Sequence, residues 1–346
     1  MRSDPTSVPM ARVAVIAVNW NGWHDTLECI ESVSHLEYRN YVLVVVDTGS
    51  TDDSLERITG WARQRKGYLL VDYTEATARA GGDPVQEQLF ASASPHARAV
   101  LIRGAVDSGP TGGGNLAIAY ALRRSPPPDY VFFLDNDATV ERDTLTHLVD
   151  LDRREDAGIV GGVVISSTTG EVQYAERTTL LRWFFAPVVA LNLPCPEDAE
   201  FWESGGASGG ALLVRRETLE AVFAAAGRHL SEEAFLDGWE IDLCTRARLA
   251  GYRCLVSRKG FVRHKGERVA RMALNPRRYY YTARSPFLFA PHFLSLHWRA
   301  LYYLWAIFLN TGRLARALLH RRPDVARAIL RGVLDGVQGV GGRWQQ

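Results

Sequence analysis

The stretch Tyr130-Val-Phe-Phe-Leu-Asp-Asn-Asp137 decides the fold of this chain. Its first five residues form a short apolar run, which is typical of a strand buried on both faces of a sheet. The carboxylates of Asp135 and Asp137 follow at the end of that strand. Carboxylate oxygens suit Mg²⁺ or Mn²⁺, which bridge substrate phosphates. Acidic pairs also cap helices, but the position directly after a buried strand favours a metal site.

Strand and helix signals alternate on both sides of this stretch, which predicts an α/β fold with a mostly parallel sheet. Ser50-Thr51-Asp52 is expected to cap the second helix, whereas periodicity is weak from 72 to 99. Strands are predicted at 13–18, 41–46, 68–71, 100–102, 130–134, 159–165 and 211–214, and helices at 25–33, 53–64, 115–124, 141–151 and 239–250.

Polar residues gather where several of these strands end. Asn21, Asp47, the glycines 112–114 and the segment 135–137 are all expected at the carboxyl ends of strands. Ligands of open α/β sheets bind at that edge. Because several separate segments converge there, the sequence predicts an active site at this edge.

The run Gly112-Gly113-Gly114-Asn115 is expected to precede a helix, so that its backbone N–H groups face a phosphate. A flexible turn is the competing interpretation. The run is neither G-x-G-x-x-G nor a P-loop lysine motif, which argues against dinucleotide oxidoreductases and P-loop NTPases.

The 346 residues carry 40 basic and 39 acidic side chains, and 47% of them are hydrophobic. These values exclude a disordered chain, a collagen-like repeat and a disulfide-stapled miniprotein. The charge is divided unevenly, with a net +12 from Arg263 onward and −11 before it. The basic part is expected either to meet an anionic partner or to dock on the acidic body.

Two features bear on the compartment. Four unpaired cysteines (Cys29, Cys195, Cys244, Cys254) and a polar N-terminus without a signal-peptide core predict a cytoplasmic protein. The aromatic segment 287–309 approaches the length of a membrane span, but Arg299, histidines and prolines interrupt it. We therefore expect a helix that packs on the body or lies on a membrane surface at the inner face.

Three segments carry a specific resemblance. Residues 13–22 (VAVIAVNWNG), 44–52 (VVVDTGSTD) and 132–137 (FFLDND) resemble the family 2 glycosyltransferases, in particular a bacterial rhamnosyltransferase-like branch. Residues 208–217, 239–248 and 262–264 continue the similarity in family order. The resemblance implies a GT-A domain over 1–266, with donor binding at about 12–140 and the acceptor and catalytic part at about 141–266. A helical basic extension would follow at 267–346.

The resemblance also implies roles for individual residues. Asn21 and Asp47 would approach the base and ribose of a nucleotide-sugar donor, and Gly113, Asn115 and Asn136 would belong to the same donor site. Asp135 would contact the ribose or lie near the Mg²⁺ or Mn²⁺ ion. Asp137 would ligate the ion, and His264 would lie at the metal–diphosphate site. The reaction would be a single displacement that inverts the anomeric centre.

Glu240 is the expected general base. The family motif usually reads Glu-Asp-x-Asp, and here Trp239 and Glu240 replace its first two acids. Asp242 is the competing base, although it can pair with Arg246 one helical turn later. Trp239 is expected either to stack on a sugar or to lie in the core, and Gly209 is expected on the acceptor side.

Several partners remain open at the level of sequence. The donor would be a UDP- or dTDP-sugar of the UDP-GlcNAc or dTDP-rhamnose type. The acceptor would be a small or carrier-bound natural-product intermediate, or a cell-envelope glycan. A nucleotidyltransferase and a non-catalytic sugar-nucleotide-binding protein are the alternatives from other classes. Nucleic acid is not expected as a partner, whereas a homo-oligomer and peripheral membrane contact through the extension remain compatible with the sequence.

Overall fold

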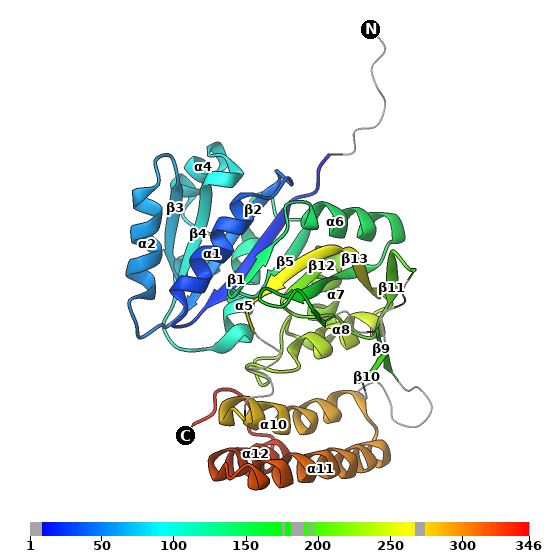
Figure 1. Cartoon of the computed structure of the whole chain (residues 1–346). Helices are drawn as coiled ribbons and strands as arrows, with labels where there is room; N and C mark the ends of the chain where they lie inside the picture. The colour runs from blue at the N-terminus through cyan, green and yellow to red at the C-terminus, as the bar shows by residue number, and fades with distance from the viewer. Residues whose placement is uncertain are drawn as a thin grey trace.

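The computed structural model describes residues 9–174, 177–180, 190–193, 196, 198–266 and 274–345. A central sheet has the strand order β11-β13-β7-β12-β5-β1-β2-β4-β3, with β6 beside β13 and β8 beside β7 (Figure 1). Its strands are β1 (Val13–Asn19), β2 (Tyr41–Thr48), β3 (Leu69–Thr74), β4 (Arg98–Gly104), β5 (Tyr130–Leu134), β6 (Ala138–Val140), β7 (Gly158–Ser166), β8 (Val172–Tyr174), β11 (Phe201–Glu203), β12 (Ala211–Arg215) and β13 (Arg253–His264). A separate hairpin joins β9 (Arg177–Leu180) and β10 (Ala190–Leu193).

Helices cover both faces of the sheet and continue into a layer below it (Figure 1). They are α1 (Trp23–Ser34), α2 (Ser54–Gln64), α3 (Glu75–Arg79), α4 (Pro84–Ser92), α5 (Gly109–Arg123), α6 (Thr144–Glu155), α7 (Arg216–Ala226), α8 (Trp239–Leu249), α10 (Pro276–Phe293), α11 (Leu296–Leu319) and α12 (Pro323–Val337). The expected α/β fold with a mostly parallel sheet and C-terminal helices is confirmed. The division of the chain into domains at residue 266 stays a prediction.

Alternate residues of the buried strands supply two separate cores. On β1, Val13 and Val15 belong to the core that includes residues of α1, α2 and α6, whereas Ala14 and Ile16 belong to the core that includes residues of α5, α7 and α8. This period of two explains why the central strands are continuous apolar runs, because both of their faces are covered. Cys29 lies in the first core, and Cys244 and Cys254 lie in the second, all buried and free as expected. Cys195 lies outside the described residues.

The directions of two strands bring distant segments to the active-site edge. β1 pairs in parallel with β2 and β5, so these three strands end at the same edge. β12 runs antiparallel to β5, with Ala211 opposite Leu134, so the beginning of β12 lies where β5 ends. β13 pairs with β6 antiparallel, with His264 opposite Ala138. Residues after β5, before β12 and at the end of β13 therefore meet.

Two local predictions are changed by the structure, and one segment without a clear prediction is defined by it. The glycines 112–114 do not precede a helix but lie within α5, which begins at Gly109. The N-cap of α2 is Asp53 rather than one of the residues Ser50–Asp52, although Asp52 Oδ1 accepts from the backbone N–H of Ser54, the first residue of α2, at 3.0 Å. The weakly periodic segment 72–99 contains two short helices, α3 and α4. For α5, the close packing of the helix on β1 and β2 explains why glycines lie within it.

Replacing Gly113 by alanine should destabilise the protein, because α5 packs directly on the sheet there. A Cβ atom at Gly113 would lie 2.6 Å from Val18 Cγ1 and 2.9 Å from Thr48 Cγ2. Overpacking of this kind costs about 1–3 kcal/mol. Urea unfolding measures the loss, with Gly60→Ala in α2 as the matched control, since a Cβ there meets nothing within 4 Å. Equal stability of the two variants would contradict the prediction.

The C-terminal helices do not form the single helix expected over residues 287–309. The chain turns at Leu294 and Ser295, so that α10 packs on the body while α11 runs back beneath it (Figure 1). The buried Arg284 of α10 donates hydrogen bonds to the carbonyls of Glu233 at 2.9 Å and Gly342 at 2.8 Å. Within the described ranges, none of the helices combines the length and the apolar character needed to cross a bilayer.

Candidate active site

Asp135, Asp137 and His264 form a compact cluster at the carboxyl edge of the sheet. His264 Nε2 lies 3.0 Å from Asp137 Oδ1 and 3.4 Å from Asp135 Oδ2. Each residue offers one ligand atom, and these atoms lie within 4.8 Å of one another. Two carboxylates and an imidazole match the ligand types that Mn²⁺ and other divalent cations accept. The residues present therefore fit a divalent cation.

The surroundings of His264 direct its Nε2 atom toward the two carboxylates. Gln173 Oε1 lies 3.1 Å from His264 Nδ1 and can accept a hydrogen bond from its N–H. When the ring is neutral and donates from Nδ1, its lone pair lies on Nε2, the state that a metal ligand needs. When the ring is protonated, Nε2–H donates to Asp137 instead. Burial raises the pKa of Asp137, but the hydrogen bond and charge of His264 outweigh it, so this pKa lies below its usual value. No sequence signal pointed to Gln173.

A chain of hydrogen bonds joins the ends of β5, β1 and β2. Asn136 Nδ2 donates to Thr26 Oγ1 at 3.0 Å, and Thr26 Oγ1 donates to Asn19 Oδ1 at 2.8 Å. Asn19 Nδ2 then donates to Asp47 Oδ2 at 2.6 Å. Asp47 also accepts from the Ser50 backbone N–H at 2.9 Å and from its hydroxyl at 2.6 Å. The network joins the segments after β1, β2 and β5 into one unit. The sequence did not indicate that these three segments are connected.

Asp47 lies beneath this loop. It is fully buried and accepts hydrogen bonds from Asn19 and Ser50, so it supports the loop, and its expected contact with the donor stays a prediction. Asn21 is exposed on that loop and adopts a φ of 51°, which asparagine tolerates better than most residues. Its Oδ1 accepts from the Thr51 backbone N–H at 2.7 Å. Of the two expected donor contacts, only Asn21 presents its side chain at the surface.

Trp239, Gly209, Asp135 and Asn136 line one small cavity of about 70 Å³. Trp239 is 7% exposed and its ring centroid lies 5.3 Å from that of Phe133, so it belongs mainly to the core. A Cβ atom at Gly209 would collide with the Trp239 indole. Gly209 thus makes room for the Trp239 indole. Both residues, which were expected on the acceptor side, lie next to Asp135 of the acidic cluster.

The two candidate bases on α8 have different surroundings. Asp242 is buried and its Oδ2 accepts from Arg246 Nη2 at 2.5 Å and Nε at 2.9 Å, as the i,i+4 spacing predicted. Arg246 also donates to the carbonyl of His229 at 2.6 Å. Glu240 lies in the first turn of the same helix and is partly buried. The structure therefore gives Asp242 a structural ion pair and leaves Glu240 as the more accessible carboxylate.

Replacing Arg246 by leucine should destabilise the fold strongly, because Asp242 would keep a buried charge without its partner. Breaking one side of a buried ion pair typically costs about 3–5 kcal/mol. Urea unfolding provides the measurement, and Arg216→Leu is the matched control, since Arg216 makes an i,i+4 pair with an exposed Glu220 on α7. A loss no larger than that of the control would argue against a structural role for the Asp242 pair.

Gly113 and Asn115 both make contacts within the protein, and their expected donor contacts stay predictions. Gly113 is buried in α5 against β1 and β2. Asn115 Nδ2 donates to the Leu230 carbonyl at 3.0 Å, and its Oδ1 accepts from the Leu230 N–H at 2.9 Å. These bonds hold the loop before α8. Both residues lie within α5 because this helix starts earlier than the sequence pattern indicated.

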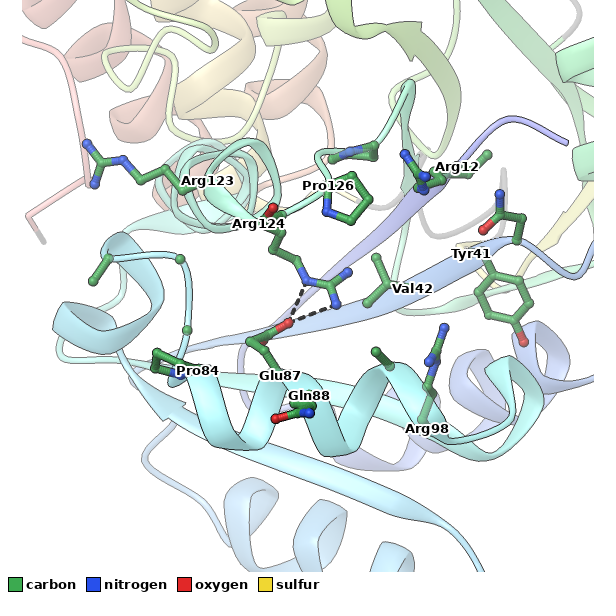
Figure 2. Close-up of a pocket in the computed structure, with 18 residues that line it drawn as sticks. Arg12, Tyr41, Val42, Pro84, Glu87, Gln88, Arg98, Arg123, Arg124 and Pro126 are labelled. Carbon is green, nitrogen blue, oxygen red and sulfur yellow. Dashed lines mark hydrogen bonds and ion pairs between the residues drawn. The ribbon is translucent and has the colours of Figure 1, made fainter. Parts of the chain in front are cut away.

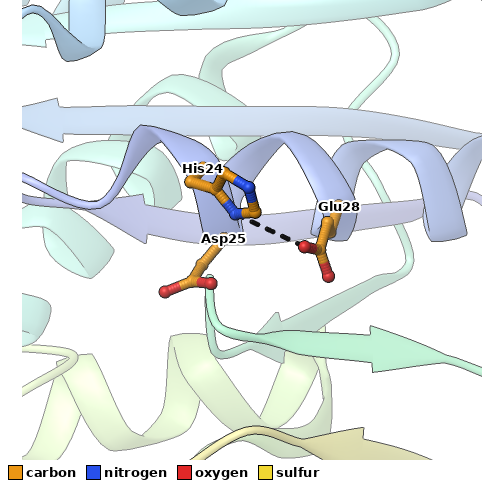
Figure 3. A group of neighbouring side chains, drawn as sticks. All are labelled: His24, Asp25 and Glu28. Carbon is orange, nitrogen blue, oxygen red and sulfur yellow. Dashed lines mark ion pairs between the residues drawn. The ribbon is translucent and has the colours of Figure 1, made fainter.

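A second group of potential ligands on α1 is neutralised by a lysine. His24, Asp25 and Glu28 lie close together (Figure 3), and His24 Nδ1 is 3.4 Å from Glu28 Oε1. Lys265 Nζ lies 2.8 Å from Asp25 Oδ1 and 2.7 Å from Glu28 Oε2. Burial lowers the pKa of Lys265, but its hydrogen bonds to both carboxylates outweigh this effect, so the pKa lies above its usual value. The Lys265 ammonium group thus occupies the position between these carboxylates that a metal ion would need. It also ties the segment after His264 to α1.

A large cavity lies at the opposite edge of the sheet. It measures about 530 Å³ and is lined by Arg12, Arg98, Arg123 and Arg124, with Glu87 as the one carboxylate among its described lining residues (Figure 2). Glu87 Oε2 accepts from Arg124 Nε at 2.8 Å. This cavity lies where β1, β2 and β4 begin, away from the acidic cluster, so we place the candidate active site at the other edge.

Arginines of the C-terminal part reach the active-site edge. The Arg277 guanidinium lies 4.5 Å from the Trp20 ring centroid, on the loop that also carries Asn21. Arg277 and Arg343 lie 3.5 Å and 3.4 Å from Asp107 Oδ2. Together with Trp20, Tyr281 and Trp344, both arginines line a cavity of about 480 Å³. The pairing with Asp107 docks this part of the basic extension on the body, one of the two outcomes that the charge distribution left open.

Solved structures share this architecture. The mannosyltransferase PcManGT from Pyrobaculum calidifontis, in complex with GDP-Man and Mn²⁺, has a TM-score of 0.57 at 17% identity, over 96% of this chain and 89% of that one. S. aureus TarS 1-349 has a TM-score of 0.52 at 16% identity, over 95% and 83% of the two chains. GalNAc-T7, in complex with UDP, GalNAc and Mn²⁺, has a TM-score of 0.53 at 15% identity, over 81% of this chain and 51% of that one. The fold is that of the GT-A glycosyltransferases.

The sequence identifies the family within this class. A family model described as glycosyl transferase family 2 matches residues 14–81 and 84–223, which is more than half of the chain. The protein therefore belongs to glycosyltransferase family 2, as the resemblance of the motifs indicated. Among curated proteins, none matches the chain significantly.

Proposed function

We propose that this protein is a metal-dependent inverting glycosyltransferase. The cluster of Asp135, Asp137 and His264 carries the proposal, because it combines metal-ligand chemistry with the edge of the sheet where nucleotides bind. The solved complexes of PcManGT and GalNAc-T7, which contain Mn²⁺, support a divalent cation here as well. Asp137 and His264 would hold the cation, with Asp135 beside it.

The reaction needs one base and one site for the leaving diphosphate. An acceptor oxygen or nitrogen attacks the anomeric carbon while the bond from that carbon to the diphosphate oxygen breaks. Glu240 accepts the proton that the acceptor loses, a contribution typically of about 10²–10⁴-fold. When bound, a divalent cation neutralises charge on the departing nucleoside diphosphate. A single displacement of this kind inverts the anomeric centre and requires no covalent intermediate.

The donor would be a UDP- or dTDP-sugar held at the joined loops after β1, β2 and β5. Asn21 would contact the nucleoside, with Asp47 fixing the loop from below and Asn136 tying it to the metal cluster. Arg277 and Arg343 add positive charge beside Trp20, which favours an anionic donor. Trp239 and Gly209 would border the acceptor. Natural-product intermediates and cell-envelope glycans both remain candidate acceptors.

A donor panel tests this proposal. The purified chain is incubated with UDP-, dTDP- and GDP-sugars in the presence of Mn²⁺, Mg²⁺ or EDTA, and nucleoside diphosphate release is measured. We expect release from a UDP- or dTDP-sugar that requires the cation. Release of pyrophosphate would instead indicate a nucleotidyltransferase, and donor binding without turnover under all conditions would indicate a non-catalytic binder. NMR of the product's anomeric signal tests inversion.

A further inference from the structure

The outward face of α11 is apolar along almost its whole length. From Leu296 to Ala315 none of its exposed side chains is an acid, a lysine or an arginine, and His297 is the one titratable group among them. Phe308 is 72% exposed and Leu319 is 84% exposed. The large apolar side chains exposed on this helix, which we call the α11 face, are Leu296, Leu301, Leu304, Ile307, Phe308, Leu309, Leu318 and Leu319.

This placement of apolar side chains toward solvent is the opposite of what is usual for a helix in water. A helix on the surface of a globular protein normally turns its charged side chains outward and its apolar stripe inward. Here Arg299 and Arg313 are partly buried, while leucines and a phenylalanine face outward. A contiguous apolar surface of this length marks a contact with another apolar phase or partner.

The charge around the α11 face has one sign. Arg316 on α11, Arg321 in the turn after it, and Arg327 and Arg331 on α12 are exposed, whereas the two acids among residues 296–345 are partly buried (Asp324) and buried (Asp335). Asp324 pairs with Arg322 at 2.7 Å, and the buried Asp335 accepts from Tyr280 at 2.7 Å. The partner of this surface should therefore be both apolar and negatively charged. A second copy of the same surface would bring like charges together.

We infer that the α11 face docks this protein on a lipid bilayer that contains anionic head groups. Helices that lie in a bilayer interface combine a leucine- and phenylalanine-rich face with arginines or lysines around it. Trp298 and Trp305 are half-buried on α11, and tryptophan favours the head-group level. α11 lies on the far side of α10 from the sheet, so the whole α11 face can meet a flat surface (Figure 1).

The docked position is compatible with access to the active-site edge. α10 separates α11 from the sheet, and Arg277 at the start of α10 contacts Trp20 beside Asn21. The inference rests on the exposed residues of α11 and on the arginines of α11, of α12 and of the turn between them. It does not depend on the proposed transfer reaction, and its test contains no activity measurement.

Co-sedimentation of the full chain with vesicles tests the inference. Vesicles of phosphatidylcholine alone are compared with vesicles that also contain phosphatidylglycerol. We expect binding to the anionic vesicles that weakens at high salt, and at least about a tenfold loss of binding in the Leu304→Glu/Phe308→Glu variant. Val85→Glu/Leu89→Glu is the matched control, because Val85 and Leu89 are 68% and 61% exposed on α4, away from the α11 face.

Three results would overturn the inference. The first is equal vesicle binding by the wild type and the Leu304→Glu/Phe308→Glu variant, with melting temperatures confirming that both are folded. The second is the absence of binding to anionic vesicles. The third is a dimer in light scattering that this variant converts to a monomer without any wild-type vesicle binding, which would identify a second copy as the occupant.

Discussion

The Glu240→Gln variant should lose transferase activity by about 10²–10⁴-fold while it binds the nucleotide-sugar donor as tightly as the wild type. Glutamine keeps the shape and hydrogen-bonding ability of the side chain but cannot accept the acceptor's proton. The loss should therefore appear in kcat and not in donor affinity. Product formation at saturating donor and calorimetric titration of the donor measure the two quantities separately.

Two controls separate a base from a structural carboxylate. Glu220→Gln on α7 changes an exposed carboxylate in the same way and should leave turnover unchanged. Asp242→Asn weakens the buried pair with Arg246 and should lower stability. Full activity of Glu240→Gln, or a loss explained entirely by weaker donor binding, would remove the assignment of Glu240 as the base.

Removing the metal ligands should have the second large effect. Asp137→Asn and His264→Ala are each expected to lower kcat/KM by about 10²–10³-fold, because charge on the leaving diphosphate would be stabilised less well. Both variants should also lose the rise in melting temperature that Mn²⁺ causes in the presence of the nucleoside diphosphate. Thermal shift with and without Mn²⁺ therefore reports on the site independently of turnover.

His24→Ala is the matched control for His264→Ala. His24 also lies beside carboxylates, but Lys265 already neutralises that group. Its replacement should leave the Mn²⁺ response unchanged. If His24→Ala and His264→Ala lost the response equally, or if the wild type showed none, the cluster of Asp135, Asp137 and His264 would not be the metal site.

The secondary structure was predictable because it follows local periodicity. The strands β1, β2, β5 and β7 and the helix α8 lie close to their expected ranges. The exceptions were positions where packing overrides local pattern. Three consecutive glycines usually signal a loop, but in α5 the middle one, Gly113, allows the helix to approach Val18 and Thr48. A turn at Leu294 likewise divides an apolar segment that could have been one helix.

Local sequence pattern also made part of the expected site predictable. Asp135 and Asp137 follow a recognisable buried strand, so their place at the sheet edge could be inferred from sequence. The supporting residues could not be inferred, because they come from unrelated segments. Gln173 fixes the His264 ring, Lys265 occupies the α1 carboxylates, and Thr26 joins Asn136 to Asn19. Asp47 is buried beneath its loop, a result that depends on the folded neighbours.

The sequence by itself determined the α/β succession, the acidic end of β5 and the family, because these depend on residues that are near one another in the chain. Only the tertiary structure decided which distant residues meet. The antiparallel direction of β12 brings Gly209 next to Asp135 and Trp239, and the pairing of β13 with β6 brings His264 to Asp137. Strand direction and pairing are non-local choices, fixed by the burial of whole faces and the completion of backbone hydrogen bonds. The same distinction applies to the basic C-terminal part, whose composition was evident while the outward apolar face of α11 emerged only on folding.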